Sequence, residues 1–223
     1  MAGIRADHSN IHGTFVTPRF HVKYMPNDLL SLRLSAGKGY RTVHPYAEFN
    51  YLMASGRELV VDDLNQEEAW NYGISGALNI PIGEKLLKIN AEYYYTNFEE
   101  QAVMDMDTYT KDGMPQVHIT NLDGKSYSHT FQIDATYPII EGLTVTAAYR
   151  MNDVKCTYGG ELMTKPLTSK YKGLLTASYK TPNGKWQFDG TLQLNGGGRM
   201  PKPYKMADTG EWSWDEEFDA FEQ

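Results

Sequence analysis

The stretch Trp186-Gln187-Phe188-Asp189-Gly190-Thr191-Leu192-Gln193-Leu194-Asn195 alternates apolar and polar residues over its whole length. A repeat of two residues indicates a β-strand, because successive side chains of a strand point to opposite faces of the sheet. The same alternation occurs at 30–36 and at 143–150. In each strand one face could contact lipid while the other contacts water, so the chain is predicted to be all-β.

Alternation along the whole chain predicts about eight strands. Most of them exceed ten residues, whereas strands in soluble proteins average about 5–6 residues and a tilted membrane strand needs about 9–11. Their length therefore favours strands that cross a membrane. The predicted ranges are 14–25, 29–40, 69–80, 85–98, 127–137, 143–157, 168–180 and 185–195.

The connections between these strands are short and long in turn. Turns rich in Pro, Asn and Gly, which suit tight hairpins, are predicted at 26–28, 81–84, 140–142 and 182–184. Long segments occupy 41–68, 99–126 and 158–167, and another follows 195. Short periplasmic turns and long external loops are typical of outer-membrane barrels. The pattern therefore predicts an antiparallel meander of long transmembrane strands in such a barrel.

The composition limits the class of protein. The chain has 223 residues, 41% of them hydrophobic, and a mean hydropathy of -0.52. It contains no run of 18 or more apolar residues, which excludes transmembrane helices but not transmembrane strands. The net charge of -7 argues against a nucleic-acid partner. Met1 to Arg5 lack the apolar core of a secretory signal, so for a barrel the sequence suggests an incomplete chain.

Aromatic residues are expected at the two membrane interfaces, where barrels gather them. The alternative is that these residues simply favour strands, since aromatic residues are enriched in any sheet. The candidates beside the short turns are Tyr24, Tyr137, Tyr179 and Trp186, and those near the long loops are Tyr40, Tyr95 and Tyr149.

Motifs for catalysis or metal binding are missing, so no enzyme activity, cofactor or metal is expected. The six histidines lack the i, i+4 spacing of a zinc protease. Asp105, Asp107 and Asp112 are close together, but the glycine and glutamate of the calcium loop are not at the required offsets. Cys156, the single cysteine, has no base beside it in sequence and cannot form an internal disulfide.

Several short motifs, in this order and spacing, resemble the barrel of TonB-dependent receptors, and the likeness is closest to those of Bacteroidota. The resemblance covers most of the chain up to about Pro201. The motifs are Thr17-Pro18-Arg19-Phe20-His21-Val22-Lys23-Tyr24, Leu32-Arg33-Leu34-Ser35-Ala36-Gly37-Lys38-Gly39-Tyr40-Arg41, Leu64-Asn65-Gln66-Glu67-Glu68-Ala69-Trp70-Asn71-Tyr72-Gly73, Tyr95-Thr96-Asn97-Phe98, Val103-Met104-Asp105-Met106-Asp107, Asn121-Leu122-Asp123-Gly124-Lys125-Ser126-Tyr127-Ser128, Gly159-Gly160-Glu161-Leu162 and 195–201.

This resemblance implies a Gram-negative outer-membrane transporter with 22 strands, a plug domain and energy supplied through TonB. The sequence departs from that pattern, because plug and TonB-contacting segments are missing and only about eight strands are found. We therefore expect residues 1–200 to be a piece from the later half of the barrel. Its expected partners are membrane lipid, the remaining barrel and plug, TonB through the missing N-terminal part, and a small ligand. Residues 201–223, an acidic aromatic tail, are expected to be loop or disordered.

Ligand recognition in such a receptor would involve the external loops and the upper lumen. The 41–68 loop is the best candidate, because it mixes aromatic platforms with polar groups that can orient a small ligand. Alternatively these residues pack loop against loop. A siderophore, a cobalamin, haem and an oligosaccharide are not separated by the sequence. The candidate residues are Tyr46, Glu48, Asn50, Tyr51 and Arg57.

A second hypothesis is a soluble or surface-attached all-β module, such as a sandwich that binds carbohydrate through its tyrosines. A sandwich should carry charged outer faces. The strands here alternate instead with Gln, Asn, Thr and Ser, which favours a barrel lumen.

Overall fold

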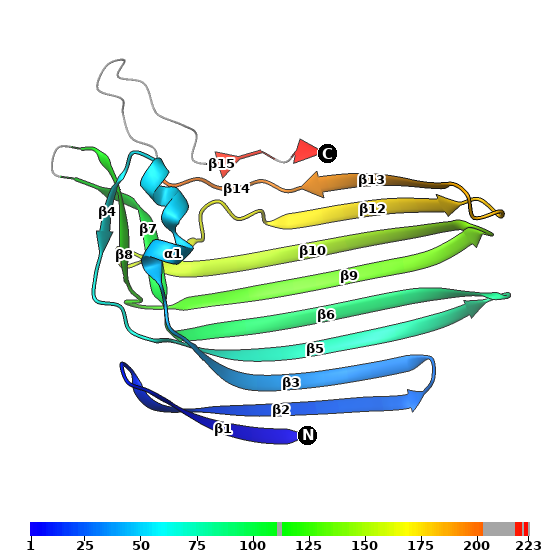
Figure 1. Cartoon of the computed structure of the whole chain (residues 1–223), viewed down its shortest axis with the longest axis horizontal. Helices are drawn as coiled ribbons and strands as arrows, with labels where there is room; N and C mark the ends of the chain where they lie inside the picture. Colours follow the sequence, from blue (N-terminus) through cyan, green and yellow to red (C-terminus); the bar gives the residue numbers. More distant parts are fainter. Residues whose placement is uncertain (111–112, 203–216, 220, 223) are drawn as a thin grey trace, which may run out of the picture.

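The computed structural model describes residues 1–110, 113–202, 217–219 and 221–222. Its main sheet has the order β1-β2-β3-β5-β6-β9-β10-β12-β13-β16, with β11 paired to β10 (Figure 1). All pairs in it are antiparallel, so the predicted meander is confirmed. The strands are β1 (Ala2–Ser9), β2 (Gly13–Asn27), β3 (Leu30–Arg41), β5 (Glu67–Ile82), β6 (Lys85–Glu100), β9 (Ser126–Ile140), β10 (Leu143–Tyr158), β11 (Glu161–Thr164), β12 (Tyr171–Lys180), β13 (Gln187–Asn195) and β16 (Phe221–Glu222).

Each predicted strand is present, with ends that differ by a few residues. Two strands that the sequence analysis did not count lie at the edges, β1 and the short β16. β16 belongs to the tail, most of which lies outside the described residues. The described part of the tail also holds β15 (Glu217–Phe218), which pairs with β14 (Gly198–Arg199).

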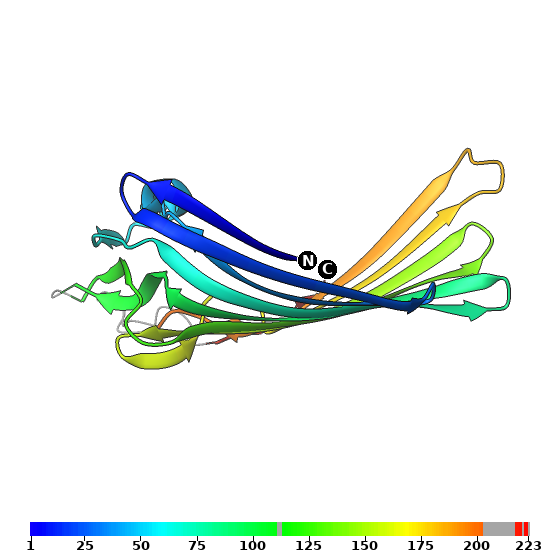
Figure 2. The same cartoon turned by 90° about the horizontal axis from the view of Figure 1, so that it is seen from below.

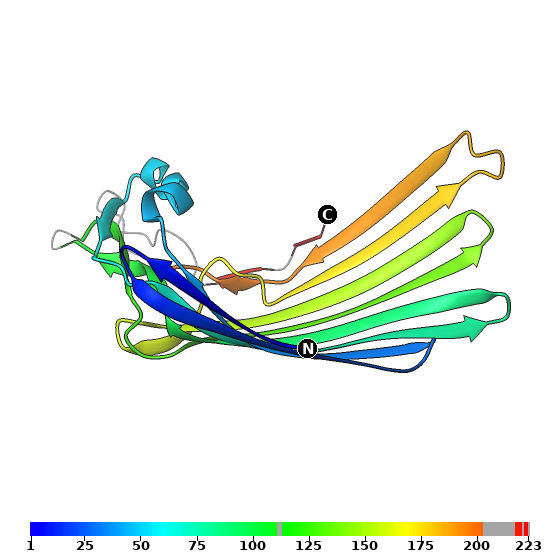
Figure 3. The same ribbon diagram turned by 60° about the horizontal axis from the view of Figure 1, so that its bottom comes forward.

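The sheet is bent and twisted into an open trough (Figures 2 and 3). Its tight turns lie together at one end, between β2 and β3, β5 and β6, β9 and β10, and β12 and β13 (Figure 1). The long connections after β3, β6 and β10 lie at the opposite end. This separation is the one that the alternation of short and long connections predicted.

The strand register sorts the side chains of the sheet onto two faces. Leu34, Ile74 and Tyr93 are cross-strand neighbours on one face, and they are 50%, 50% and 39% exposed. The opposite face carries Arg33, Ser75 and Glu92 in the adjacent register row. Because water-exposed apolar residues in contiguous rows are unfavourable in a soluble protein, the first face needs an apolar surrounding. We call these the apolar face and the polar face.

The long connections after β3 and β6 fold together into a small unit, the loop cap, which comprises residues 42–66 and 101–125. It contains α1 (Pro45–Glu48), the 3-10 helix η1 (Asn50–Ala54), and a three-stranded sheet in the order β4-β8-β7. The strands are β4 (Glu58–Val61), β7 (Ala102–Tyr109) and β8 (Pro115–Asn121). The loop cap lies at the end of the trough opposite the tight turns (Figure 1).

The loop cap has its own hydrophobic core. Val117 and Ile119 of β8 are fully buried, and Leu52 of η1 and Met106 of β7 pack with them. A second cluster joins Val103 of β7 to Cys156 and Tyr158 of β10. These contacts fix the loop cap to the end of the sheet.

The sandwich hypothesis is wrong as to fold. A sandwich buries the inner faces of two packed sheets, whereas the main sheet of the described residues is one long meander whose apolar face stays uncovered. No helix of the described part of the chain is long and apolar enough to cross a membrane.

Candidate functional site

The five ligand residues predicted from the 41–68 loop all lie in the loop cap. Tyr46 and Tyr51 are 66% and 57% exposed, and Asn50 between them is exposed too. They belong to α1, which begins at Pro45, and to η1, which begins at Asn50 and buries Leu52 in the core. The two phenol rings are therefore presented to solvent from a packed base.

Glu48 bonds within its own loop. One carboxylate oxygen accepts the backbone N–H of His44 at 3.0 Å, and the other accepts Arg41 Nη1 at 2.7 Å. The His44 N–H, followed by the Arg41 charge, lowers the pKa of Glu48. The structure thus gives Glu48 a role in fastening α1 to the end of β3.

Tyr51 and Arg57 both reach β7 beneath them. The Tyr51 hydroxyl lies 3.7 Å from Met104 Sδ, and Arg57 Nη1 donates to the Met106 carbonyl at 3.3 Å. Packing of loop against loop therefore accounts for part of this group. Tyr46 and Asn50 remain as the predicted residues whose side chains form no hydrogen bond or ion pair within the described chain.

Next to the loop cap, the polar face of β2, β3 and β5 holds a pocket of about 460 Å³. At its rim, Arg41 Nε donates to Glu67 Oε2 at 2.6 Å. The other Glu67 oxygen accepts the backbone N–H of Ala102 at 3.2 Å. One buried carboxylate thus ties β3 and β5 to the start of β7, at the point where the pocket meets the loop cap. The lining residues are Arg19, His21, Ser35, Ala36, Gly37, Lys38, Gly39, Tyr40, Arg41, Glu67, Glu68, Ala69, Asn71 and Phe98.

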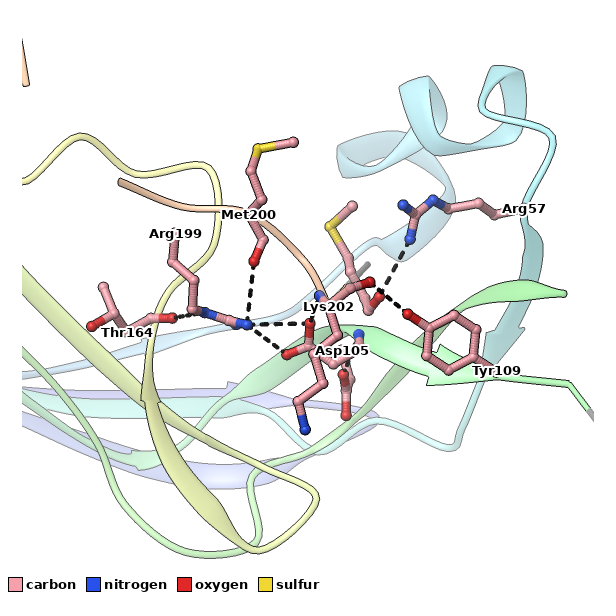
Figure 4. Close-up of polar contacts among 9 residues, drawn as sticks. Arg57, Asp105, Tyr109, Thr164, Arg199, Met200 and Lys202 are labelled. Carbon is pink, nitrogen blue, oxygen red and sulfur yellow. Dashed lines mark hydrogen bonds and ion pairs between the residues drawn. The ribbon is translucent and has the colours of Figure 1, made fainter. Parts of the chain in front are cut away.

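Three long connections meet at Arg199, which follows β13 (Figure 4). Its Nη1 contacts both carboxylate oxygens of Asp107 at 2.9 and 3.2 Å, and its Nε donates to the Thr164 carbonyl at 2.7 Å. Its guanidinium also lies over the Tyr158 ring, 5.5 Å from the centroid. We call Arg199, Asp107 and Thr164 the Arg199 clasp, since they join β7, β11 and β14.

Other groups extend the Arg199 clasp (Figure 4). Asp107 Oδ1 accepts the backbone N–H of Lys202 at 2.7 Å, and the Tyr109 hydroxyl donates to the Lys202 carbonyl at 2.5 Å. Asp105 is buried beside it, and burial raises the pKa of this carboxyl. Of the three aspartates considered for calcium, Asp105 accepts the backbone N–H of Asp107 at 2.8 Å, Asp107 binds Arg199, and Asp112 lies outside the described residues.

The predicted interface aromatics that lie in strands share the apolar face. Their registers pair Tyr24 with Leu32, Tyr137 with Val145, and Tyr179 with Leu143 and Phe188. Tyr95 is paired with Tyr72 and Tyr149 with Ile133, which puts both tyrosines on the same face. Tyr40, paired with Glu68, also lies on this face by its register in β3. Trp186, just before β13, is 65% exposed. Tyr149 lies nearer the tight-turn end of β10 than the sequence analysis placed it.

The apolar face carries a contiguous aromatic cluster, of which the sequence predicted only Tyr95 as an interface residue. Tyr95 stacks on His129 at 4.8 Å between ring centroids and lies 6.3 Å from Tyr72. The Tyr93 hydroxyl is 2.7 Å from His129 Nδ1, and Tyr127 packs edge-on against the same imidazole. These residues come from β5, β6 and β9, so only the strand register brings them together.

The described residues contain no group of three or more His, Cys, Asp or Glu side chains that could hold a metal ion. Cys156, which has no base beside it in sequence, is buried in the cluster with Val103 and Tyr158.

Comparison with known proteins identifies the fold family. The family model of the TonB dependent receptor-like β-barrel matches residues 1–219. The chain belongs to this family. The barrel resemblance drawn from the sequence motifs is therefore confirmed, and so is the interpretation of the meander as part of such a barrel. No curated protein sequence matches the chain.

Solved receptor structures have the same fold. The FrpB iron transporter from Neisseria meningitidis superposes with a TM-score of 0.60 at 14% identity, covering 94% of this chain and 30% of that one. The FpvAI–pyocin S2 complex gives 0.62 at 16% identity, with coverages of 94% and 26%. The ferric enterobactin receptor PfeA in complex with BCV-L6 gives 0.65 at 13%, with coverages of 99% and 34%. The chain thus spans about a third or less of the length of these proteins.

Proposed function

We propose that this chain is the ligand-facing wall of an outer-membrane receptor that takes up a small ligand with energy from TonB. Its strands cross the outer membrane of a Gram-negative cell, with the apolar face in lipid and the polar face in the lumen. The loop cap faces outward. The remaining barrel strands, the plug and the contact with TonB are supplied by the rest of the receptor.

The observation that carries this proposal is the sorting of side chains by face. Exposed apolar residues fill contiguous rows on one side of the sheet, and polar residues line the hollowed side. In water the apolar rows would drive aggregation, whereas in lipid they are the surface that a barrel needs. An open sheet edge is costly in lipid, so the edge strands β1 and β16 must pair with further strands.

Ligand contact is assigned to the outer side of the loop cap and the adjoining pocket. Among the described residues, the Tyr46 and Asn50 side chains have no hydrogen-bond or ion-pair partner, and Glu48, which lies between them in sequence, contacts Arg41 of the pocket lining. The similar structures include receptors described as an iron transporter and a ferric enterobactin receptor. An iron chelate is therefore the first ligand class to test.

Membrane topology can be tested by labelling single cysteines in intact cells that make the protein. Cys156→Ser removes the single cysteine of this sequence, and a cysteine is then placed at Tyr46 in α1 or at Glu84 in the β5–β6 turn. A membrane-impermeant maleimide should label Tyr46→Cys in intact cells. It should label Glu84→Cys only after the outer membrane is permeabilised. Equal labelling of both in intact cells, or recovery of the protein in the soluble fraction, would contradict the proposal.

Ligand contact can be tested by uptake of a panel of ferric chelates labelled with radioactive iron. Tyr46→Ala and Asn50→Ala should lower uptake of the transported chelate, because each removes an exposed group of the loop cap. Met114→Ala is a matched control, since Met114 is 61% exposed in the same loop cap but outside the predicted group. Unchanged uptake in both test variants would remove the α1 region from the ligand site.

A further inference from the structure

Basic side chains occupy alternate positions of β2 on the polar face. Arg19, His21 and Lys23 are all exposed there, and Arg33 of β3 lies directly opposite Lys23. Their spacing of two residues along one strand places them in a line that runs from the pocket beside the loop cap toward the tight turn. We call these residues the β2 basic row.

Among the described residues, acidic side chains do not neutralise the β2 basic row. Within the described part of the chain, the side chains of Arg19, Lys23 and Arg33 take part in no hydrogen bond or ion pair. Their partners in register beside the pocket are neutral, Gly37 opposite Arg19 and Ser35 opposite His21. Glu92 is two strands away from Arg33, roughly 10 Å at the usual strand spacing. Like charges opposite each other destabilise a sheet, so Lys23 and Arg33 call for an anion.

Arg41, in the same pocket, is by contrast a cation that is neutralised by ion pairs. It contacts two carboxylates, Glu67 at 2.6 Å and Glu48 at 2.7 Å. The nearby Arg5 is paired with Asp7 at 2.6 Å. Against these two paired arginines, Arg19 is a free guanidinium that lines an open pocket.

The pocket has room for a ligand next to Arg19. Its floor includes Gly37 and Gly39 of β3. A Cβ atom at Gly39 would meet nothing within 4 Å, so the space above this residue is open. A guanidinium and an imidazole beside a bare strand can approach a carboxylate or phosphate closely, and a guanidinium binds such groups bidentately.

We infer that the β2 basic row and its pocket form an anion site, which selects a small ligand that carries several carboxylates or phosphates. The inference rests on the proposed function and deepens it by naming the charge class of the ligand. Arg19 and His21 hold the anion in the pocket, and Lys23 and Arg33 continue the attraction down the lumen wall.

The test measures binding of citrate and pyrophosphate, as polyanionic probes, to the purified receptor by calorimetry. The wild-type protein should bind at least one probe, and added salt should weaken binding because exposed charges are screened. Arg19→Gln should weaken it about tenfold, the size expected for losing one hydrogen bond to a charged group. Lys172→Gln is the matched control, as a charge on the same face but outside the pocket. Equal losses in the two variants, or no binding of either probe by the wild type, would overturn the inference.

A second variant blocks the space and keeps the charge. Gly39→Val should abolish probe binding, because its side chain would occupy the pocket while a β-branched residue suits the strand. Gly190→Val in β13 is the control, since a Cβ there also meets nothing within 4 Å but lies on the apolar face. Binding that survives Gly39→Val would contradict the pocket.

The same variants also distinguish a small anionic ligand from an acidic segment of the plug as the partner of the β2 basic row. If Arg19→Gln lowered the thermal stability of the receptor but left probe affinity unchanged, the basic row would serve the plug and the inference would fail. Failure of the proposed function is seen separately, through the cysteine labelling in intact cells. Correct labelling without anion binding would reject the anion site alone.

Discussion

The main sheet and the loop cap place their apolar residues in opposite ways. In the sheet, Leu34 and Ile74 are 50% exposed, while in the loop cap Val117 and Ile119 are fully buried. The loop cap is stabilised in the same way as a water-soluble domain, because its apolar side chains are buried against one another. The sheet leaves its apolar rows for a solvent that is not water. One chain is therefore built for two solvents, with the boundary between them near the end of β3 and the start of β5.

The largest difference in stability between the two regions is expected when one apolar residue of each is truncated to alanine. Ile119→Ala should destabilise the loop cap by about 2–5 kcal/mol, because it leaves a cavity in a packed core. Ile74→Ala on the apolar face should cost much less, since lipid can fill the space. Hydrogen exchange of loop cap and sheet amides in the membrane-embedded receptor measures both. Similar costs at the two positions would remove the distinction.

A charge on each face of β3 sharpens the comparison within the sheet. Leu34→Lys should destabilise the barrel by about 2–4 kcal/mol, the cost of a cation facing lipid near the midplane. Ser35→Lys, one residue along, lies on the polar face opposite His21 and should cost less, at most the roughly 0.2–1 kcal/mol of a like-charged cross-strand pair. Urea unfolding of the receptor in lipid vesicles provides the two values. A greater loss for Ser35→Lys would reverse the assignment of the faces.

The Arg199 clasp should stabilise only the external end of the molecule. Arg199→Gln is expected to destabilise the join of β7, β11 and β14 by about 1.5–3 kcal/mol, because Asp107 loses a charged donor. Limited proteolysis should then cut the 158–170 segment faster. Lys165→Gln, an exposed neighbour, is the control and should leave the rate unchanged. Loss of barrel assembly with Arg199→Gln would show that the clasp supports the sheet as well.

The smallest effect concerns pH at α1. The folded pKa of Glu48 is lowered, so its stabilising effect is complete above the unfolded pKa, about 4.3, and is lost as pH falls through the folded value. The protection of the 46–49 amides, taken as their exchange rate relative to the intrinsic rate at the same pH, should therefore fall below about pH 4, and Glu48→Gln should abolish that change. An acid-induced change of equal size in Glu48→Gln would assign it to another group.

The strands were predictable because alternation is a local signal. Each residue of 186–195 reports its own face, and turn residues such as Pro182, Asn183 and Gly184 mark the hairpin directly. β1 was not counted, since its eight residues include small and charged side chains beside the apolar ones.

The site was predictable only in part. The sequence pointed to the 41–68 loop, but its core is completed by Val117 and Ile119 from a separate segment. Arg199 and Asp107 are 92 positions apart, and no short-range pattern joins them. Arg19, His21 and Lys23 of the β2 basic row could be predicted as alternate residues of one strand, yet the absence of acidic partners among the described residues depends on the register of β2, β3 and β5.

The central claim is that one face of the sheet meets lipid and the other an aqueous lumen. Spin labels placed singly at consecutive positions 88–93 of β6, in the membrane-embedded receptor, test it directly. Accessibility to a polar relaxing agent should be high at Lys88, Asn90 and Glu92, and accessibility to oxygen high at Ile89, Ala91 and Tyr93, because their registers place these sets on opposite faces. High polar accessibility at all six positions would contradict the account.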